Sequence, residues 1–169
     1  MTTYGERDLS WLAQHHYADL DPRAERALRE AGLHWHDESE AERLLGEAEQ
    51  LAPSHRAVVI ARYRYCLYKH RFADACTHAE QCLSTAAREL GLSDDFREVT
   101  AQDAAFAEPE AGERFWLFAL QAYAYVLLRS GRRTESDQAF AKVVELDSGD
   151  QTKTRVLVDV IARHDAGDD

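Results

Sequence analysis

Glycine and proline are scarce in this 169-residue chain, which has eight glycines and three prolines. Both residues interrupt regular structure, so their scarcity leaves long stretches free to form it. No run of about 18 apolar residues occurs, and the first residues lack the apolar core of a signal sequence. We therefore expect a cytoplasmic protein with no membrane partner, folded as a single domain over residues 1–169.

Basic residues are also in deficit, with 20 Lys and Arg against 31 Asp and Glu, which gives a net charge of -11. Such a surface repels phosphate backbones, so we expect no nucleic-acid partner. Its charge favours association with a basic protein surface instead. Hydrophobic residues make up 45% of the chain and charged residues 30%, a mixture typical of globular proteins rather than disordered ones.

Motifs for catalysis and cofactor binding are missing as well. The cysteines Cys66, Cys76 and Cys82 are odd in number and form no CxxC pair, so we expect small core residues in a reducing compartment. No GxSxG motif occurs, and the glycines are scattered singly rather than clustered before a helix. The sequence therefore predicts no enzyme, no catalytic residues and no cofactor.

What the chain does contain is an internal repeat. Three apolar residues of small to medium size recur 34 residues later, and each set, spaced by four and then three residues, lies on one helical face. The two sets are Ala41, Leu45 and Ala48, and Ala75, Ala79 and Cys82. Small side chains at this spacing let a neighbouring helix approach closely, so the repeat predicts helix packing.

The 34-residue period and the segment 41–53, which ends in a proline, resemble the second helix of a tetratricopeptide repeat. The following unit has a first helix through Tyr68, a turn over 69–72 with histidine where a small residue is usual, and a second helix over 73–87. A third unit resembles the same pattern from Leu117, with Ala124 at the small packing site, Gly131 at the turn and Phe140 at the aromatic site. Ser136 and Ser148 replace the usual alanine and proline.

An acidic insert over about 90–116 separates the second and third units. Its apolar residues Phe96, Val99 and Phe106 predict a loop that folds back onto the body, either as a lid over a groove or on the opposite side. The segment Phe115–Leu120 that follows is apolar on every side and must be covered by the insert or by another subunit, so a homodimer is possible.

The flanking segments complete the expected fold. Asp150 is predicted to cap a final helix with an apolar stripe of Val156, Leu157, Val160 and Ile161. Two short helices are expected at the start, around Leu9–Leu12 and over 22–31, the second begun by proline. The resemblance thus implies an all-α fold, an α-α superhelix of two to three helical hairpins with N-terminal helices and a C-terminal capping helix.

The resemblance also implies a concave groove lined by the first helices of the units, where a protein or peptide partner binds. Transferring the usual groove positions gives Ala57, Ile60, Arg64, Leu67 and Tyr68 in the second unit, and Phe118, Gln121, Tyr125, Leu128 and Arg129 in the third. Arginines among tyrosines suit a peptide carrying acid, although the same residues could form an ordinary solvated helix face. The lysine and asparagine of the carboxylate-clamp subfamily are not reproduced.

Two further readings bear on function. His34, His36 and Asp37 could contribute to a metal site, but alternate histidines point together only on an extended segment, so a surface turn without metal is favoured. We expect a non-enzymatic protein-interaction module; the alternatives are a small cytosolic secretion-type chaperone and a self-associating structural subunit. The segment Phe115–Tyr125 is also similar to small repeat proteins encoded near bacterial nitrogen-fixation genes.

Overall fold

The computed structural model describes residues 17–167, and every regular element in that range is helical. This confirms the predicted all-α class. The α-helices of this range are α2 (Pro22–Leu33), α3 (Glu38–Leu51), α4 (Arg56–Tyr68), α5 (Phe72–Leu90), α6 (Ala111–Arg129), α7 (Arg133–Leu146) and α8 (Thr154–Ala166). A short 3₁₀ helix, η1 (Phe96–Glu98), lies between α5 and α6.

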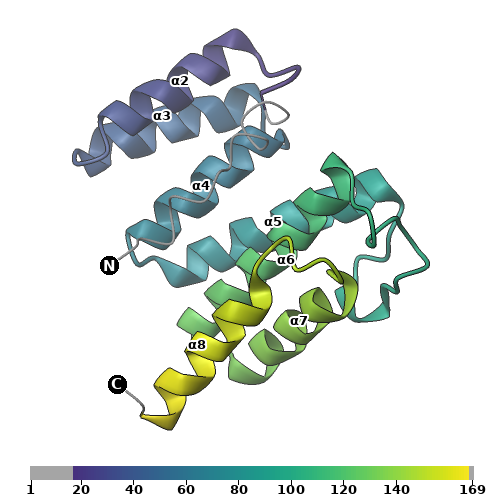
Figure 1. The fold of residues 1–169 in the computed structure, drawn as a ribbon. Helices are drawn as coiled ribbons and strands as arrows, with labels where there is room; N and C mark the ends of the chain where they lie inside the picture. The colour runs from purple at the N-terminus through teal and green to yellow at the C-terminus, as the bar shows by residue number, and fades with distance from the viewer. Residues whose placement is uncertain (1–16, 168–169) are drawn as a thin grey trace.

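Consecutive helices pack as hairpins, α2 with α3, α4 with α5 and α6 with α7, and the hairpins stack into a superhelix (Figure 1). The strongest contact between hairpins joins α5 to α6, and α8 packs against α7 at the end of the stack. None of the helices within residues 17–167 has both the length and the apolar composition needed to cross a bilayer.

Local sequence signals fix most of the helix ends. Pro22 begins α2, as predicted, and the Asp21 side chain accepts a hydrogen bond from the Arg23 backbone N–H. Asp37 caps α3 in the same way through Glu40 N. The turn between α6 and α7 uses Gly131 at φ 78°, the left-handed conformation that glycine adopts at low cost, which confirms its predicted place.

His70 takes the corresponding left-handed position, φ 57°, in the turn between α4 and α5. A residue with a Cβ in this conformation costs about 1 kcal/mol relative to glycine. We expect His70→Gly to raise the free energy of unfolding by up to about 1 kcal/mol, because the relieved strain outweighs the entropy gained by the unfolded chain. Urea denaturation measures the change, and a β-branched control, His70→Val, should lower stability; a loss of stability in His70→Gly would contradict the argument.

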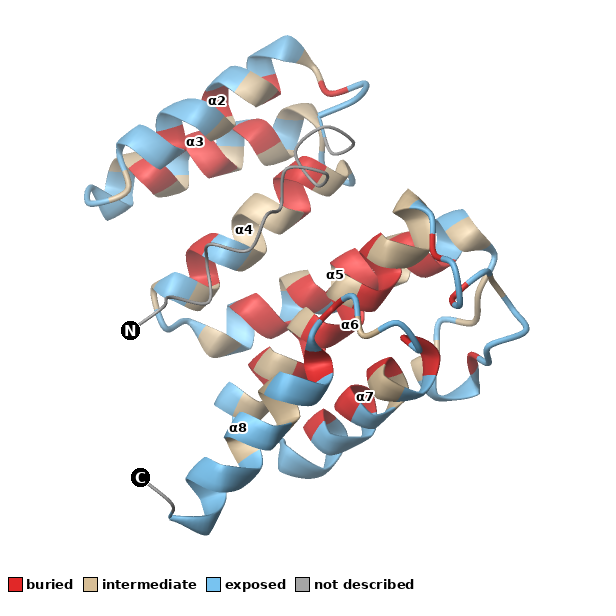
Figure 2. Cartoon of the chain, viewed as in Figure 1, coloured by how far each residue is buried: buried red, intermediate tan, exposed pale blue. Residues whose placement is uncertain are grey.

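The repeated small residues lie in the core, as the sequence predicts. Each member of the two sets is buried, with relative exposures between 0% and 6%: Ala41, Leu45, Ala48, Ala75, Ala79 and Cys82. The corresponding residues of the third unit, Ala124, Ser136 and Phe140, are buried too, and Ser136 Oγ donates to Ala124 O across the α6–α7 hairpin. Figure 2 shows the buried residues concentrated where the helices face one another.

The third unit begins earlier than predicted. Its first helix, α6, starts at Ala111 rather than near Leu117, so the insert ends at about residue 110. The first turn of α6 carries no apolar face, which is why the pattern missed it. Gly112 lies so close to the end of α5 that an added Cβ would sit 3.0 Å from Leu90 Cδ2.

The insert folds back onto the body, as its apolar residues predict. Phe106 is buried against Trp116, with ring centroids 5.3 Å apart, and Phe96 meets Tyr123 edge-on at 6.4 Å. Lys142 of α7 donates to Val99 O at 3.0 Å. The insert therefore covers α6 and α7, and the apolar start of α6 is buried within its own chain, which removes the observation that suggested a homodimer.

The predicted cap of the last helix was wrong. Thr154 begins α8 and Lys153 holds its N-cap position, whereas Asp150 lies one turn earlier and accepts only a long bond, 3.4 Å, from Arg155 N. The turn is instead built on Asp147, whose carboxylate accepts from Gln151 N at 2.9 Å, Thr152 N at 2.8 Å and Thr152 Oγ1 at 2.7 Å. Nothing in the local sequence around Asp147 indicates where these bonds go.

Only half of the predicted apolar stripe of α8 faces the core. Leu157 and Ile161 are half-buried against it together with Val158, whereas Val156 and Val160 are 56% and 53% exposed. The stripe is rotated because the Asp147 turn sets the direction in which α8 leaves α7. The predicted helix around Leu9–Leu12 lies outside the described residues.

Candidate protein-binding groove

The first helices of the second and third hairpins, α4 and α6, lie side by side and run in the same direction. The Arg56 guanidinium of α4 lies 4.2 Å from the Phe115 ring centroid of α6, and Tyr63 Oη donates to Ala122 O at 3.4 Å. The partners are 59 residues apart in both contacts, so the two helices keep one register. Side chains at equivalent positions of α4 and α6 therefore lie at the same level.

These two helices are basic within an acidic protein. Together they contain five arginines and a single glutamate, Glu113, and α4 has no acidic residue at all. The chain as a whole carries a net charge of -11. Charge is therefore segregated, with an excess of positive side chains on the pair of helices that the sequence predicted to line a groove.

Arg64 and Arg129 stand out among these arginines because neither forms an ion pair with a carboxylate within residues 17–167. Most other basic side chains in that range do, for example Arg62 with Glu42 and Glu49, and other exceptions, such as Arg26, Arg88 and Arg163, lie outside α4 and α6. Arg64 and Arg129 are both exposed. In the common register Arg64 is level with residue 123, so Arg129 lies about six residues, or about 9 Å, further along the helices.

The Arg129 side chain is held in place by two aromatic residues. Its guanidinium carbon lies 4.6 Å from the Phe72 ring centroid at the start of α5, and its Nη1 donates to Tyr125 Oη at 3.1 Å. Stacking on a ring leaves the outer edge of the guanidinium free to form paired hydrogen bonds with a carboxylate. Arg129 is therefore preorganised for an acidic group.

The predicted groove residues differ in exposure. Arg64, Tyr68 and Arg129 are exposed, and Ile60, Leu67, Phe118, Tyr125 and Leu128 are half-buried. Ala57 is buried. The mixture of apolar area and charged tips suits a helical or extended peptide segment with alternating apolar and acidic residues.

Gln121 is the exception, and its prediction as a partner-binding residue was wrong. It is buried at 4% exposure, and its Nε2 donates to Thr152 O at 2.9 Å and to Thr154 Oγ1 at 2.8 Å. The start of α8 thus covers this position of α6. The sequence pattern could not show that the chain returns to cover this position.

An aromatic cluster at one end of α4 was not assigned from the sequence. Trp35, in the turn between α2 and α3, meets Tyr65 and Tyr68 edge-on at 5.2 and 5.9 Å. Lys69 Nζ lies 5.7 Å from the ring centroids of both Trp35 and Tyr65. The cluster fixes Tyr68, which is 50% exposed, at the C-terminal end of α4.

The turn between α2 and α3 also contains the two histidines that were considered as metal ligands. His34 and His36 are exposed on either side of Trp35, and Asp37 is engaged as the cap of α3, so the segment is the surface turn that the sequence favoured. No group of three or more His, Cys, Asp or Glu side chains within residues 17–167 is arranged to hold a metal ion.

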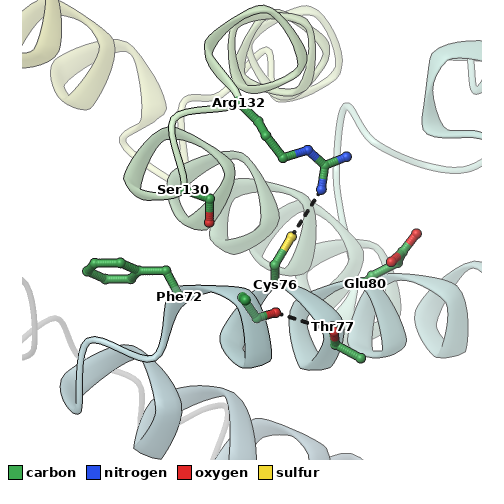
Figure 3. A pocket seen from close by; sticks show the side chains of 7 residues that line it. Phe72, Cys76, Thr77, Glu80, Ser130 and Arg132 are labelled. Carbon is green, nitrogen blue, oxygen red and sulfur yellow. Dashed lines mark hydrogen bonds between the residues drawn. The ribbon is translucent and has the colours of Figure 1, made fainter.

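An open hollow of about 400 Å³ lies beside Arg129, between the start of α5 and the turn from α6 to α7 (Figure 3). Phe72 and Cys76 line it, and Arg132 reaches across to place its Nη1 3.6 Å from Cys76 Sγ. Arg132 is also paired with Glu135. Arg132 favours the thiolate of Cys76, but burial has the larger effect and raises the pKa of that thiol.

The cysteines are buried, as predicted. Burial raises the pKa of Cys66 and Cys76, in each case as the largest effect, and raises the pKa of Cys82 to about 12. A thiol must ionise to act as a nucleophile, so all three are poor ones near neutral pH.

Comparison with known proteins gives one relative that covers most of the chain. It is named "Uncharacterized 19.8 kDa protein in nifW 5'region", from Azotobacter chroococcum mcd 1, and is 36% identical over 132 residues, which is 76% of this chain and 73% of the relative. This chain belongs to the family of that protein. No protein-family model matches the chain, and no solved structure matches it.

Proposed function

We propose that this chain is a non-enzymatic, tetratricopeptide-like module that binds an acidic segment of a partner protein in the groove between α4 and α6. The observation that carries the proposal is that Arg64 and Arg129 lie on two helices in one register, both exposed and with no carboxylate partner within the described residues of a protein with net charge -11. Such a pair is available to an external acid, which can form charge-assisted hydrogen bonds with both side chains.

The chemistry of the surface defines the partner further. Two cationic sites about 9 Å apart along the helices match acidic residues about two turns apart on one face of a bound helix, at i and i+7. The half-buried Ile60 and Leu67 beside them call for an apolar residue at the centre of the same segment. We therefore infer an amphipathic, acidic helix as the bound segment, in a cytoplasmic partner.

The genetic setting of the relative supports a biological context. Its name places it in the nifW 5′ region. The segment Phe115–Tyr125 lies on α6, one of the two groove helices, and is similar to small repeat proteins encoded near nitrogen-fixation genes. We infer that the partner is encoded in such a neighbourhood.

The test measures binding of defined peptides. Peptides of about 16 residues are selected from a displayed library on the unchanged protein, and their Kd is measured by fluorescence anisotropy for Arg64→Glu, Arg129→Glu. Hydrogen bonds to charged groups contribute about 1.5 kcal/mol or more each, so the double variant is expected to bind about 100-fold more weakly or worse. Affinity for the unchanged protein should also fall as salt is added.

The matched control is Arg26→Glu, Arg88→Glu, which makes the same change of net charge at two exposed arginines of α2 and α5, outside the groove. Its Kd should stay within about threefold of the unchanged protein, since distant surface charges contribute little. An equal loss of peptide affinity in both double variants would show that binding depends on net charge alone. Unchanged binding in Arg64→Glu, Arg129→Glu would place the binding surface elsewhere.

A further inference from the structure

The hollow beside Arg129 joins the proposed groove at Phe72. The Arg129 guanidinium carbon lies 4.6 Å from the Phe72 ring centroid, and the same Phe72 side chain lines one end of the hollow (Figure 3). The volume of the hollow, about 400 Å³, lies within the range found for sites that bind small molecules. A segment bound at Arg129 can therefore place a neighbouring side chain in it.

One row of residues along α5 forms a wall of the hollow. Phe72, Cys76 and Glu80 have i, i+4 and i+8 spacing, which puts them on one side of the helix over about 12 Å. Figure 3 shows Cys76 between the other two. The hollow thus has an aromatic ring at the end beside Arg129, a buried thiol in the middle and a carboxylate at the other end.

The charges around the hollow leave one carboxylate without a partner. Arg132, on the opposite wall, is already paired with Glu135, with 2.5 Å between Nη2 and Oε2. Glu80 is exposed and forms no ion pair or hydrogen bond within residues 17–167. Two carboxylates and one guanidinium leave an excess of negative charge, so the Glu80 end of the hollow attracts a cation.

The Glu80 carboxylate acts on groups of both helices that meet at the hollow. Burial has the largest effect on the Cys76 thiol and raises its pKa; Arg132 lowers this pKa, and Glu80 raises it. Burial also raises the pKa of Tyr123 on α6, and Glu80 adds to that rise. The carboxylate is therefore close to the floor of the hollow and can reach a cation held over Cys76.

We propose that the hollow receives a lysine or arginine side chain of the bound segment, with its apolar stem against Phe72 and Cys76 and its cationic end at Glu80. Both side chains combine a long apolar stem, which covers apolar surface, with a charged end that stays in contact with water. The inference rests on the proposed function for the segment that supplies the side chain. The preference of the hollow for such a group is independent of it.

The place of the hollow sets the order of charges on the segment. In the common register Arg129 lies further along the helices than Arg64, and the turn that lines the hollow follows directly with Ser130. The basic residue therefore lies beyond the acid that contacts Arg129, on the side away from the acid at Arg64. We expect a spacing of about three or four residues between this acid and the base, one turn of a bound helix.

The first test needs no partner and uses Cys76, which lines the hollow at 7% exposure, as the reporter. Hexylammonium stands in for the side chain, and alkylation of Cys76 by iodoacetamide is timed at pH 8.5 and assigned by mass spectrometry. A ligand of this size binds with a Kd on the order of tens of millimolar, so about 100 mM should slow alkylation about threefold. Hexanoate at equal ionic strength should not. Cys66 and Cys82, outside the hollow, report any general loosening of the fold.

Glu80→Gln removes the charge and keeps the size of the side chain. Because Glu80 itself affects the Cys76 thiol, each rate is compared with that of the same variant without hexylammonium. Protection should fall below about 1.5-fold in Glu80→Gln, because the cationic end has lost its carboxylate. The matched control, Glu30→Gln, changes an exposed glutamate of α2 and should keep the protection. No protection of the unchanged chain, equal protection by hexanoate, or full protection in Glu80→Gln would overturn the inference.

Peptides selected on the unchanged protein give the second test. They should carry lysine or arginine three or four residues from an acid, and Glu80→Lys should weaken their binding about fivefold, because an opposite pair becomes a like pair. Replacing the basic residue of the peptide with glutamate should restore the affinity for Glu80→Lys and weaken binding to the unchanged protein. A peptide whose affinity is the same for Glu80→Lys and the unchanged protein would contradict the inference.

The two tests separate failure of this inference from failure of the proposed function. If peptide binding depends on Arg64 and Arg129 but not on Glu80, and hexylammonium leaves Cys76 unprotected, the hollow is excluded and the groove stands. If hexylammonium protects Cys76 through Glu80 while no peptide depends on the two arginines, the proposed function fails and the preference of the hollow for a cation stands.

Discussion

Trp116→Ala is expected to lower the free energy of unfolding by about 3–5 kcal/mol, the largest effect of a single substitution that we predict. Trp116 has 0% exposure and is the bulkiest side chain buried beneath the insert, where its ring contacts Phe106. Removing the indole leaves a cavity and uncovers the apolar start of α6. For a chain of this size the melting temperature should fall by about 10 °C.

Trp116→Phe provides the matched control. Trp116 Nε1 is buried with no hydrogen-bond partner among the described residues, so the indole carries an unsatisfied donor. Phenylalanine removes this donor, which offsets part of the lost contact area, and the cost should be below about 1.5 kcal/mol. Urea denaturation of both variants checks the prediction. Similar losses for alanine and phenylalanine would mean that the site cannot adjust around a smaller ring.

The contact between Trp116 and Phe106 of the insert should couple the effects of their substitutions on stability. The two rings are in contact, so the losses for Trp116→Ala and Phe106→Ala should not add. The double variant is expected to be more stable than the sum of the single losses predicts, by about 1 kcal/mol. Additive losses would show that the insert is held without this contact.

Asp147→Ala is expected to lower the free energy of unfolding by about 3 kcal/mol and to release α8. The carboxylate belongs to a residue that is 1% exposed, and it accepts bonds from the backbone and side chain of Thr152 and from Gln151 N. Its removal leaves these donors unsatisfied in the interior. Hydrogen exchange should show faster exchange of the α8 amides than of those in α5.

Asp159→Ala is the control for this prediction. Asp159 is an exposed residue of α8, and its removal should change stability by less than about 0.5 kcal/mol. Because Gln121 reaches the same turn through Thr152 and Thr154, release of α8 would also uncover its amide. An Asp147→Ala protein with unchanged exchange in α8 would show that apolar contacts alone hold the helix.

Much of the fold could be predicted because its signals are local. The 34-residue recurrence of Ala41, Leu45 and Ala48 places small residues on one helical face, and such residues let a neighbouring helix pack closely. Pro22 and Gly131 mark a helix start and a helix end through their own backbone preferences. The start of α6 was predicted wrongly because its first turn has no apolar face that would indicate a helix.

The predicted groove residues depend on the resemblance to the tetratricopeptide repeat, which placed Arg64 and Arg129 on the first helices of two hairpins, and both do lie on α4 and α6. Neither arginine pairs with an acid among the described residues, and Phe72 holds Arg129 in place. Both facts depend on which helices become neighbours. Gln121 shows the limit, since residues 31 and 33 positions later in the chain cover it.

The sequence by itself determined the helices, the hairpins and the charge of α4 and α6, because side chains at i, i+3 and i+4 share a face whatever the rest of the chain does. Only the tertiary structure decided that the insert covers Trp116, that α8 turns on Asp147 and that Arg64 and Arg129 meet no acid within residues 17–167. These features depend on contacts between residues far apart in sequence, and no local pattern encodes which partner a buried polar or charged group will meet.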